Sequence, residues 1–363
     1  MKRKCLAVGI ILLFVGTSVI PAIAQDMEKP SLPTSSGHWL YVGGSGPGNY
    51  TKIQDAIDNA SDGDIVFVFN ESSPYYETLK IEKSIDLIGE DAYSTVINGE
   101  RKNIVINVLA DGVVLEGFTI CNYNGTQQGP GLRLHANFSF ITNNIITDCE
   151  FGISIYYSHN NNISHNIIKV SDPGILIWRA SNNSIFNNFI SDQTNGIYNF
   201  QSSNNLISYN IFRNQSESGV NLEQTSNERV IHNIIINSSI SGISLQHTKN
   251  TNEIKYNSIN SCNISIDLWN CSNQIIKYNI IRDSYLGINL ITVESNSIWY
   301  NSFIHNNITA LFFNSYRNGW RMNYWNRPRL LPYLIFGINK FGDNSTYWIN
   351  VDWRPALKPY VIS

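Results

Sequence analysis

Five residues near the middle of the chain have the right types and spacing to bind a sugar. Tyr156, Trp178 and Phe200 follow one another at steps of 22 residues, and Arg179 and Tyr198 lie beside them in the sequence. Aromatic rings can stack on the apolar C–H face of a sugar, and an Arg side chain donates hydrogen bonds to its polar edge. We expect these five residues to form a carbohydrate-binding platform. The alternative is that the aromatic residues of the C-terminal segment cover them.

A second candidate group is acidic: Asp148, Glu150, Asp172 and Asp192 occur within a short stretch. Carboxylates that are brought together can hold calcium, or the pKa of one can rise so that it acts as a general acid. These four are the candidate catalytic residues if the chain is a lyase, epimerase or glycosidase. The alternative is that they are ordinary solvated turn residues.

Both groups depend on a repeat that fixes which side chains become neighbours. Two residues after each repeated Asn, and three residues before it, the chain carries mostly Ile or another large apolar residue. The repeated Asn residues, at steps of 22 to 24, are Asn144, Asn166, Asn188, Asn210, Asn233, Asn257, Asn279, Asn301 and Asn323.

Short segments rich in β-branched residues, separated by Asn, Ser and Gly turns, are typical of strands rather than helices. Strands that recur without crossover helices can be parallel only if the chain coils as a solenoid. We therefore predict an all-β, single-stranded parallel β-helix of about 22 residues per coil. The repeated Asn residues should stack as a ladder, because their amides can hydrogen-bond along it and Asn tolerates left-handed corners.

The ends of such a solenoid need covers, because they expose strand edges. Residues 51–59 place Ile53, Ala56 and Ile57 on one helical face, which predicts an N-terminal capping helix. The expected layout is a signal peptide at 1–24, a linker at 25–38, the β-helix at 39–325 and an irregular C-terminal cap at 326–363. Strands are also expected near 65–69, 78–81, 85–88 and 113–115.

The N-terminus reads as a secretory signal. A basic start at residues 2–4 precedes an apolar run over residues 6–20, and Ala22 and Ala24 form a small-x-small cleavage site. We expect a secreted, periplasmic or cell-surface protein with no membrane span after cleavage. An uncleaved membrane anchor is the alternative. Asn-x-Ser/Thr sites such as Asn162 and Asn263 would make it a glycoprotein if they are occupied.

Cysteine and histidine give little support to a metal site. After cleavage, Cys121, Cys149, Cys262 and Cys271 remain, with no C-x-x-C pair, and their disulfide pairing is left open. Copper needs clustered Met, Cys or His, and these residues are scattered. We expect no metal or other cofactor, with calcium relevant only to a lyase.

The charge balance argues against nucleic acid. Among 363 residues there are 25 basic and 28 acidic ones, which gives a net charge of −3 with no basic stripe. Phosphate binding requires clustered Lys and Arg. The hydrophobic fraction of 42% also argues against a disordered chain.

Three motifs resemble known β-helix proteins. The repeat at residues 183–190 (NSIFNNFI) resembles that of NosD-like right-handed parallel β-helix proteins, in the pectin-lyase-like superfamily. The segment 44–57 resembles the helix-capped entry of that family and of pectinesterase-like β-helices. Residues 323–325 (NYW) and 351–356 (VDWRPA) resemble the NosD-like C-terminal signature. The resemblance spans residues 40–358.

The resemblance implies the fold more specifically than an activity. The uronan-epimerase motif Asp-Pro-His is interrupted here, since Gly174 follows Asp172 and Pro173. We expect an exported protein whose partner is a polysaccharide or cell-surface glycan, or one with a structural role. Two alternatives remain: a uronate polysaccharide lyase or epimerase, and a NosD-like accessory factor for maturing an exported metalloenzyme. The oligomeric state is left open.

Overall fold

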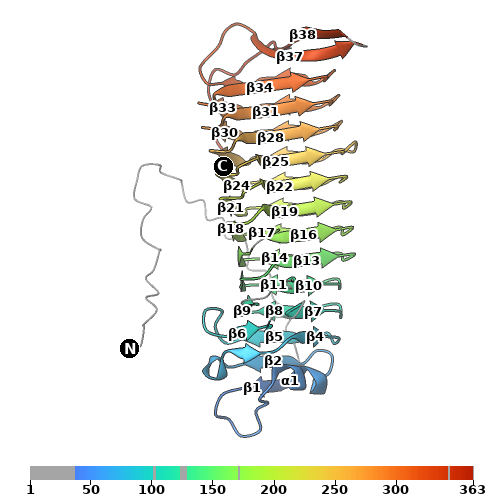
Figure 1. The fold of residues 1–363 in the computed structure, drawn as a ribbon, viewed down its shortest axis with the longest axis vertical. Coiled ribbons are helices and arrows are strands. Elements are labelled where there is room, and N and C mark those ends of the chain that lie inside the picture. The colour runs from blue at the N-terminus through green and yellow to red at the C-terminus, as the bar shows by residue number, and fades with distance from the viewer. Residues whose placement is uncertain (1–36, 101–103, 123–128, 171, 342–343, 363) are drawn as a thin grey trace, which may run out of the picture. The chain divides into compact units, whose positions relative to one another are not determined.

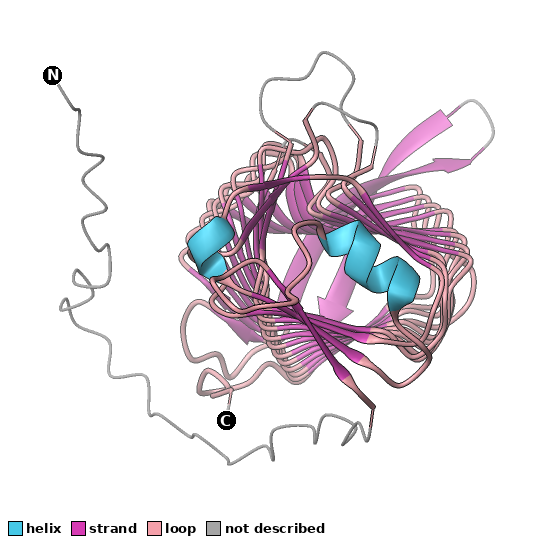
Figure 2. Ribbon diagram, turned by 90° about the horizontal axis from the view of Figure 1, so that it is seen from below, coloured by secondary structure: helices cyan, strands magenta, loops and turns pink. Residues whose placement is uncertain are grey.

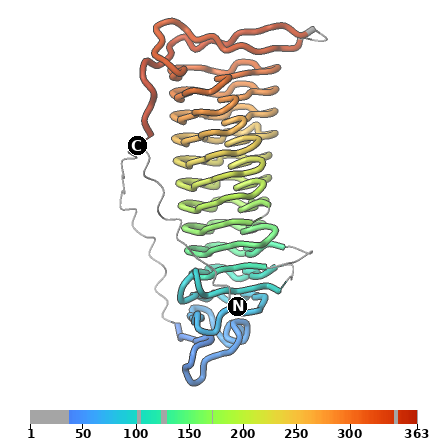
Figure 3. Tube along the Cα trace, turned by 60° about the vertical axis from the view of Figure 1, so that its left-hand side comes forward, coloured from blue at the N-terminus to red at the C-terminus, as the bar shows by residue number. Residues whose placement is uncertain are grey.

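The chain winds into stacked coils, each built from three short strands (Figure 1 and Figure 3). The computed structural model describes residues 37–100, 104–122, 129–170, 172–341 and 344–362. Each strand pairs in parallel with its counterparts in the neighbouring coils, except in a C-terminal hairpin. This confirms the predicted parallel β-helix and its coil of about 22 residues. The expected signal peptide lies outside the described residues.

Three parallel sheets run along the coils. Sheet A contains β1 (Trp39–Val42), β2 (Ile65–Val68), β5 (Asp86–Gly89), β8 (Val114–Glu116), β11 (Phe140–Thr142), β14 (Asn162–Ser164), β17 (Ser184–Phe186), β20 (Leu206–Ser208), β23 (Arg229–Ile231), β26 (Glu253–Lys255), β29 (Ile275–Lys277), β32 (Ser297–Trp299) and β35 (Gly319–Arg321). Sheet B contains β3 (Tyr75–Tyr76), β6 (Val96–Asn98), β9 (Thr119–Cys121), β12 (Ile145–Thr147), β15 (Ile167–Lys169), β18 (Phe189–Ser191), β21 (Ile211–Arg213), β24 (Ile234–Ile236), β27 (Ser258–Asn260), β30 (Ile280–Arg282), β33 (Ser302–Ile304) and β36 (Tyr324–Trp325). Sheet C contains β4 (Leu79–Ile81), β7 (Ile106–Val108), β10 (Leu132–Leu134), β13 (Ile153–Tyr156), β16 (Ile175–Trp178), β19 (Asn195–Phe200), β22 (Ser218–Glu223), β25 (Ser241–Gln246), β28 (Ile264–Trp269), β31 (Leu286–Ile291), β34 (Ile308–Phe313), β37 (Tyr333–Phe341) and β38 (Asn344–Asp352).

The core is made of apolar columns, because residues in register stack directly above one another. Ile163, Ile185 and Ile207 are paired in this way in sheet A and are fully buried. Near the start of the sheet C strands, glycine lets neighbouring coils pack closely. A Cβ atom at Gly219 would lie 2.7 Å from the carbonyl oxygen of Gly242 in the next coil.

The predicted Asn ladder is present between sheets A and B. The backbone and side-chain N–H groups of Asn188 each donate to Oδ1 of Asn210 at 3.0 Å. Asn210 Nδ2 in turn donates to the Ile185 carbonyl at 2.9 Å. The ladder thus satisfies buried backbone groups that a tight corner would otherwise leave unpaired.

The structure corrects one part of the reasoning about this ladder. The left-handed residue at the corner is the one before each ladder Asn, as at Tyr209 (φ 55°) and His232 (φ 56°). Aromatic residues with positive φ are uncommon. Here their rings stack, and Tyr209 and His232 lie 4.9 Å apart, nearly parallel.

A second, mixed ladder stands at the corner between sheets C and A. Its described members are buried and bond to one another like the first ladder. They are Asn161, Asn183, Asn205, Glu228, Asn252, Gln274, Asn296 and Asn318. This ladder was not predicted from the repeat.

Both ends of the coils are covered, as predicted. Helix α1 (Ile53–Asn59) lies across the N-terminal opening (Figure 2) and buries Ile53, Ala56 and Ile57. The 3₁₀ turn η1 (Asn70–Ser72) comes after β2. The Glu77 carboxylate accepts the first two helical N–H groups at 2.9 and 3.0 Å.

At the other end, the segment expected to be irregular contains the antiparallel hairpin β37–β38. Asp352 ends the Asn ladder there by accepting the backbone N–H of Asn323 at 2.9 Å.

Candidate functional site

The outward face of sheet C places the three predicted aromatic residues in one row. Tyr156 pairs in register with Trp178, and Trp178 with Phe200. Their ring centroids are 6.2 Å and 4.5 Å apart, with interplanar angles of 21° and 35°. The rings therefore form a surface that follows the long axis of the coils.

This row is accessible. Tyr156 is 37% exposed, and Trp178 and Phe200 are half-buried by one another. The C-terminal Tyr360 packs edge-on against Tyr278 and Tyr300 instead, with ring centroids 6.1 and 5.9 Å away. The alternative in which Tyr360 covers the row therefore does not hold.

Arg179 and Tyr198 border the row, as predicted, and both are held by hydrogen bonds. Arg179 donates from Nε to Gln201 Oε1 at 2.7 Å and from Nη1 to the Tyr157 hydroxyl at 2.8 Å. Tyr198 donates its hydroxyl to Glu223 Oε2 at 2.6 Å. Burial, together with the Glu223 carboxylate, raises the pKa of Tyr198, so its hydroxyl remains a donor.

The row continues through coils that the sequence analysis did not include. Phe200 is followed in register by Glu223, Gln246, Trp269, Ile291 and Phe313. Trp269 is 45% exposed and Phe313 37%. The same rule, one residue past the fourth apolar column, would have found them. Two polar residues, Glu223 and Gln246, interrupt the aromatic pattern and hid its continuation.

Polar groups lie close to Trp269. The His247 ring lies 4.5 Å from that of Trp269, and Asn270 Nδ2 lies 3.0 Å from His247 Nδ1. Asp267, outward on the same strand, accepts a hydrogen bond from Asn289 Nδ2 at 2.9 Å, and burial raises its pKa. This part of the face offers an aromatic ring beside several hydrogen-bonding groups, which is the combination that a sugar ring requires.

The four acidic candidates lie in two different columns. Asp172 and Glu150 are neighbours, and the Asp172 backbone N–H donates to the Glu150 carbonyl at 2.7 Å. Asp148 and Asp192 lie in another turn column, with Val170 in register between them. They are therefore two coils, or about 10 Å, apart.

Their electrostatic settings also differ. Burial, with a smaller effect from Glu217, raises the pKa of Asp172. Asp192 is exposed, and the Asn214 amide and Lys169 ammonium lower its pKa; the Lys169 Nζ lies 3.5 Å away. Among the residues that the structure describes, no three His, Cys, Asp or Glu side chains form a group able to hold a metal ion.

The four cysteines that the structure describes are free and buried. Cys262 and Cys271 stand just before and just after β28, so the strand holds them about 25 Å apart, much too far for a disulfide. Burial raises the pKa of Cys121 and Cys149 to about 12 and that of Cys271 to about 11.

Parts of the chain match two family models. Residues 130–270 match "Right handed beta helix region", which confirms the predicted handedness. Residues 213–352 match "Periplasmic copper-binding protein (NosD)". No curated protein sequence matches the chain.

Among the residues that the structure describes, the side chains do not form a copper site of the kind that the second description names. Copper needs clustered soft ligands, and a cysteine binds metal as its thiolate. The described thiols are buried, with raised pKa values, and form no cluster with His or acidic side chains.

No helix among the described residues is long and apolar enough to cross a membrane.

Three solved structures illustrate the likeness in fold. The mannuronan C-5 epimerase AlgE6 A-module of Azotobacter vinelandii aligns with a TM-score of 0.68 at 12% identity, covering 84% of this chain and 93% of that one. The surface adhesin PfbA of Streptococcus pneumoniae aligns at 0.56 and 13%, covering 84% and 95%. The receptor-binding tailspike of bacteriophage Det7 aligns at 0.59 and 11%, covering 80% and 70%.

At these identities, the structural likeness establishes the shared fold and leaves the activity to the residues of the site. The fold, the repeat and the two family models agree with one another. The chain is therefore a right-handed parallel β-helix in which residues 213–352 are similar to the NosD family.

Proposed function

We propose that this protein binds a polysaccharide or cell-surface glycan along the outward face of sheet C. The supporting observation is the in-register row that runs from Tyr156 through Trp178 and Phe200 to Trp269 and Phe313, in which Tyr156, Trp269 and Phe313 are exposed and Trp178 and Phe200 are half-buried. Neighbouring strands are about 4.8 Å apart. An extended polymer lying along the coils would meet a side chain of this row at each step.

The chemistry of the row fits a sugar better than an apolar partner. Aromatic rings provide surfaces for stacking, while Arg179, Glu223 and Gln246 provide donors and acceptors beside them. An apolar partner would desolvate these polar groups without pairing them, which costs free energy. Export, which the basic and apolar N-terminus supports, would bring this face to a glycan outside the cytoplasm.

The experiment is co-sedimentation of residues 25–363 with a panel of insoluble neutral and uronate polysaccharides, with and without calcium. We expect at least one polymer to retain the protein, and Trp178→Ala to lose most of that binding. The matched control is Trp39→Ala, an exposed Trp on sheet A. Failure of every polymer to retain the protein would contradict the proposal.

A second candidate function is a carbohydrate-active enzyme that acts on uronates. It is favoured by the raised pKa of Asp172, which suits a general acid, with Glu150 and Glu217 nearby. The same incubations, assayed for new reducing or unsaturated sugar ends, test this function. New sugar ends that form with the wild type and not with Asp172→Asn would establish the enzymatic function. If no polymer yields new ends, glycan binding is the remaining function.

A further inference from the structure

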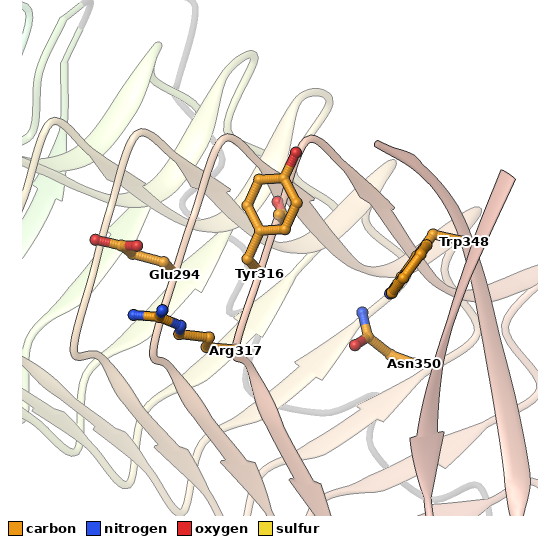
Figure 4. Close-up of a pocket in the computed structure, with 6 residues that line it drawn as sticks. Glu294, Tyr316, Arg317, Trp348 and Asn350 are labelled. Atoms are coloured by element: carbon orange, nitrogen blue, oxygen red, sulfur yellow. The ribbon is translucent and has the colours of Figure 1, made fainter. Parts of the chain in front are cut away.

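A cleft lies apart from the outward face of sheet C, between the C-terminal hairpin and the last coils (Figure 4). Its volume is about 450 Å³, within the range of small-molecule pockets. One wall carries Trp348 and Asn350 of β38. The other carries Glu294, Tyr316 and Arg317, from the corner turns between sheets C and A.

The hairpin explains why the cleft stays open. Trp348, Asn350 and Asp352 alternate along β38 and so share one face, and Asp352 is fully buried against the end of the Asn ladder. This face is therefore the one turned toward the coils. Trp348 lies on this inward face and is still 48% exposed. The reason is that β37 pairs with β34 at only two positions, so most of the hairpin extends beyond the last paired coil.

The opposite wall offers two charged groups, Glu294 and Arg317, that form no ion pair within the described part of the chain. Glu294 and Tyr316 occupy successive coils in register, and Arg317 follows in a left-handed turn with φ 52°. Within the described part of the chain, the Glu294 and Arg317 side chains form no ion pair and no hydrogen bond. Asn350 adds a buried Nδ2 atom that has no hydrogen-bond partner.

These groups together select a class of ligand. The Trp348 indole provides a flat apolar surface, while Arg317 and Asn350 donate hydrogen bonds and Glu294 accepts them. A purely apolar ligand would leave these groups unpaired, and an anion would meet the Glu294 carboxylate as well as the Arg317 guanidinium. A neutral ring with one apolar face and a rim of hydroxyl groups satisfies all of them.

We propose that this cleft is a second binding site, which takes one or two units of a neutral pyranose sugar stacked on Trp348. The site is independent of the polymer-binding face on sheet C. Soluble small sugars should therefore bind here even if no polymer binds the outer face.

The experiment uses saturation-transfer NMR and fluorine NMR of the fluorotryptophan-labelled chain. The probes are D-glucose, D-galactose, D-mannose, N-acetyl-D-glucosamine and cellobiose, with D-glucuronate as the charged comparison. We expect at least one neutral sugar to bind and to shift the Trp348 signal. Trp348→Ala should weaken that sugar at least about tenfold, and Trp348→Phe should recover part of the loss.

Four further variants separate this site from the rest of the molecule. Glu294→Gln and Arg317→Gln should each weaken the sugar several-fold, because each removes a charged hydrogen-bonding group. Trp353→Ala changes a Trp that is 73% exposed just past β38 and does not line the cleft, so affinity should not change. Trp178→Ala should also leave small-sugar binding intact while it weakens polymer binding.

Two results would overturn the proposal: no neutral sugar binding, or binding that is unchanged in Trp348→Ala. Tighter binding of D-glucuronate than of every neutral sugar would overturn the assignment to neutral ligands. Small-sugar binding without any polymer binding would support this site and contradict the proposed function of the sheet C face.

Discussion

Glu228 stands in a ladder whose other described members are all amides, and replacing it with Gln should change how stability depends on pH. Its two carboxyl oxygens accept the backbone and side-chain N–H groups of Asn205, each at 3.1 Å. Its own backbone N–H donates to Asn252 Oδ1 at 2.8 Å. A ladder amide also donates, as Asn205 does to the Ala180 carbonyl at 3.0 Å, but a carboxylate cannot.

The magnitude follows from the pKa of this group. Burial raises the pKa of Glu228 from 4.5 to about 8, and the hydrogen bonds from Asn205 oppose part of that rise. Each pH unit of difference corresponds to about 1.4 kcal/mol. Ionisation of Glu228 should therefore cost about 5 kcal/mol of the free energy of unfolding at high pH.

The pH range follows from the sign of the shift. Below pH 4.5 the carboxyl is protonated in both the folded and unfolded states, so its titration costs nothing. Between 4.5 and about 8 the unfolded chain loses the proton while the folded chain keeps it, and stability falls. Above about 8 the loss is complete. Glu228→Gln should remove this loss, so its advantage should grow from near zero at acidic pH to several kcal/mol at alkaline pH.

The assay is urea unfolding followed by circular dichroism from about pH 4 to pH 9. Gln fits this ladder, since Gln274 already occupies an equivalent place and accepts the Asn252 backbone N–H at 3.1 Å. Gln274→Glu should introduce a second loss of folding stability as the pH rises. Glu71→Gln, an equal charge change at an exposed site, should leave the profile unchanged. Parallel pH profiles for the wild type and Glu228→Gln would refute the reasoning.

Three other consequences can be measured. Asn210→Ala removes the side-chain acceptor of the Asn188 backbone N–H and the side-chain donor to the Ile185 carbonyl, and should lower the free energy of unfolding by about 3 kcal/mol; a loss below about 1 kcal/mol in urea unfolding would contradict the role of the ladder. Asp352→Ala removes the acceptor for Asn323 and for the Trp325 indole N–H, at 2.9 and 3.0 Å, so limited proteolysis should cut the last coils first; unchanged cleavage kinetics would count against this cap. Burial lowers the pKa of His232, so the pKa that NMR measures for its ring should lie below the ordinary histidine value. A pKa at or above that value would show that the ring is not buried between its stacked neighbours, Tyr209 and Tyr256.

The repeat made most of the fold predictable. A column of Ile and a column of Asn at one fixed step allow a single arrangement of coils, so the core residues could be assigned before any coordinates. The left-handed conformation was predicted at the ladder Asn, one residue too late. Asn tolerates positive φ, whereas a Tyr or His at the preceding position gives no sequence signal for it. The ladder that contains Glu228 was missed because its members mix Asn, Gln and Glu.

The candidate site was only partly predictable, for the same kind of reason. Tyr156, Trp178 and Phe200 occur in consecutive coils, so the repeat alone aligned them. Trp269 lies three coils beyond Phe200, after two polar residues, and so escaped notice. The cleft at Trp348 could not be predicted, because it depends on how a segment without the repeat folds back on the last coils.

The most direct test of the central claim compares two Trp variants on whichever polysaccharide retains the wild-type protein. Trp178→Ala removes the middle ring of the aromatic row on sheet C, and Trp39→Ala removes an exposed ring on sheet A. We predict that Trp178→Ala weakens binding by about tenfold or more while Trp39→Ala binds like the wild type. Equal affinities for the two variants, with both folded, would contradict a glycan-binding role for sheet C.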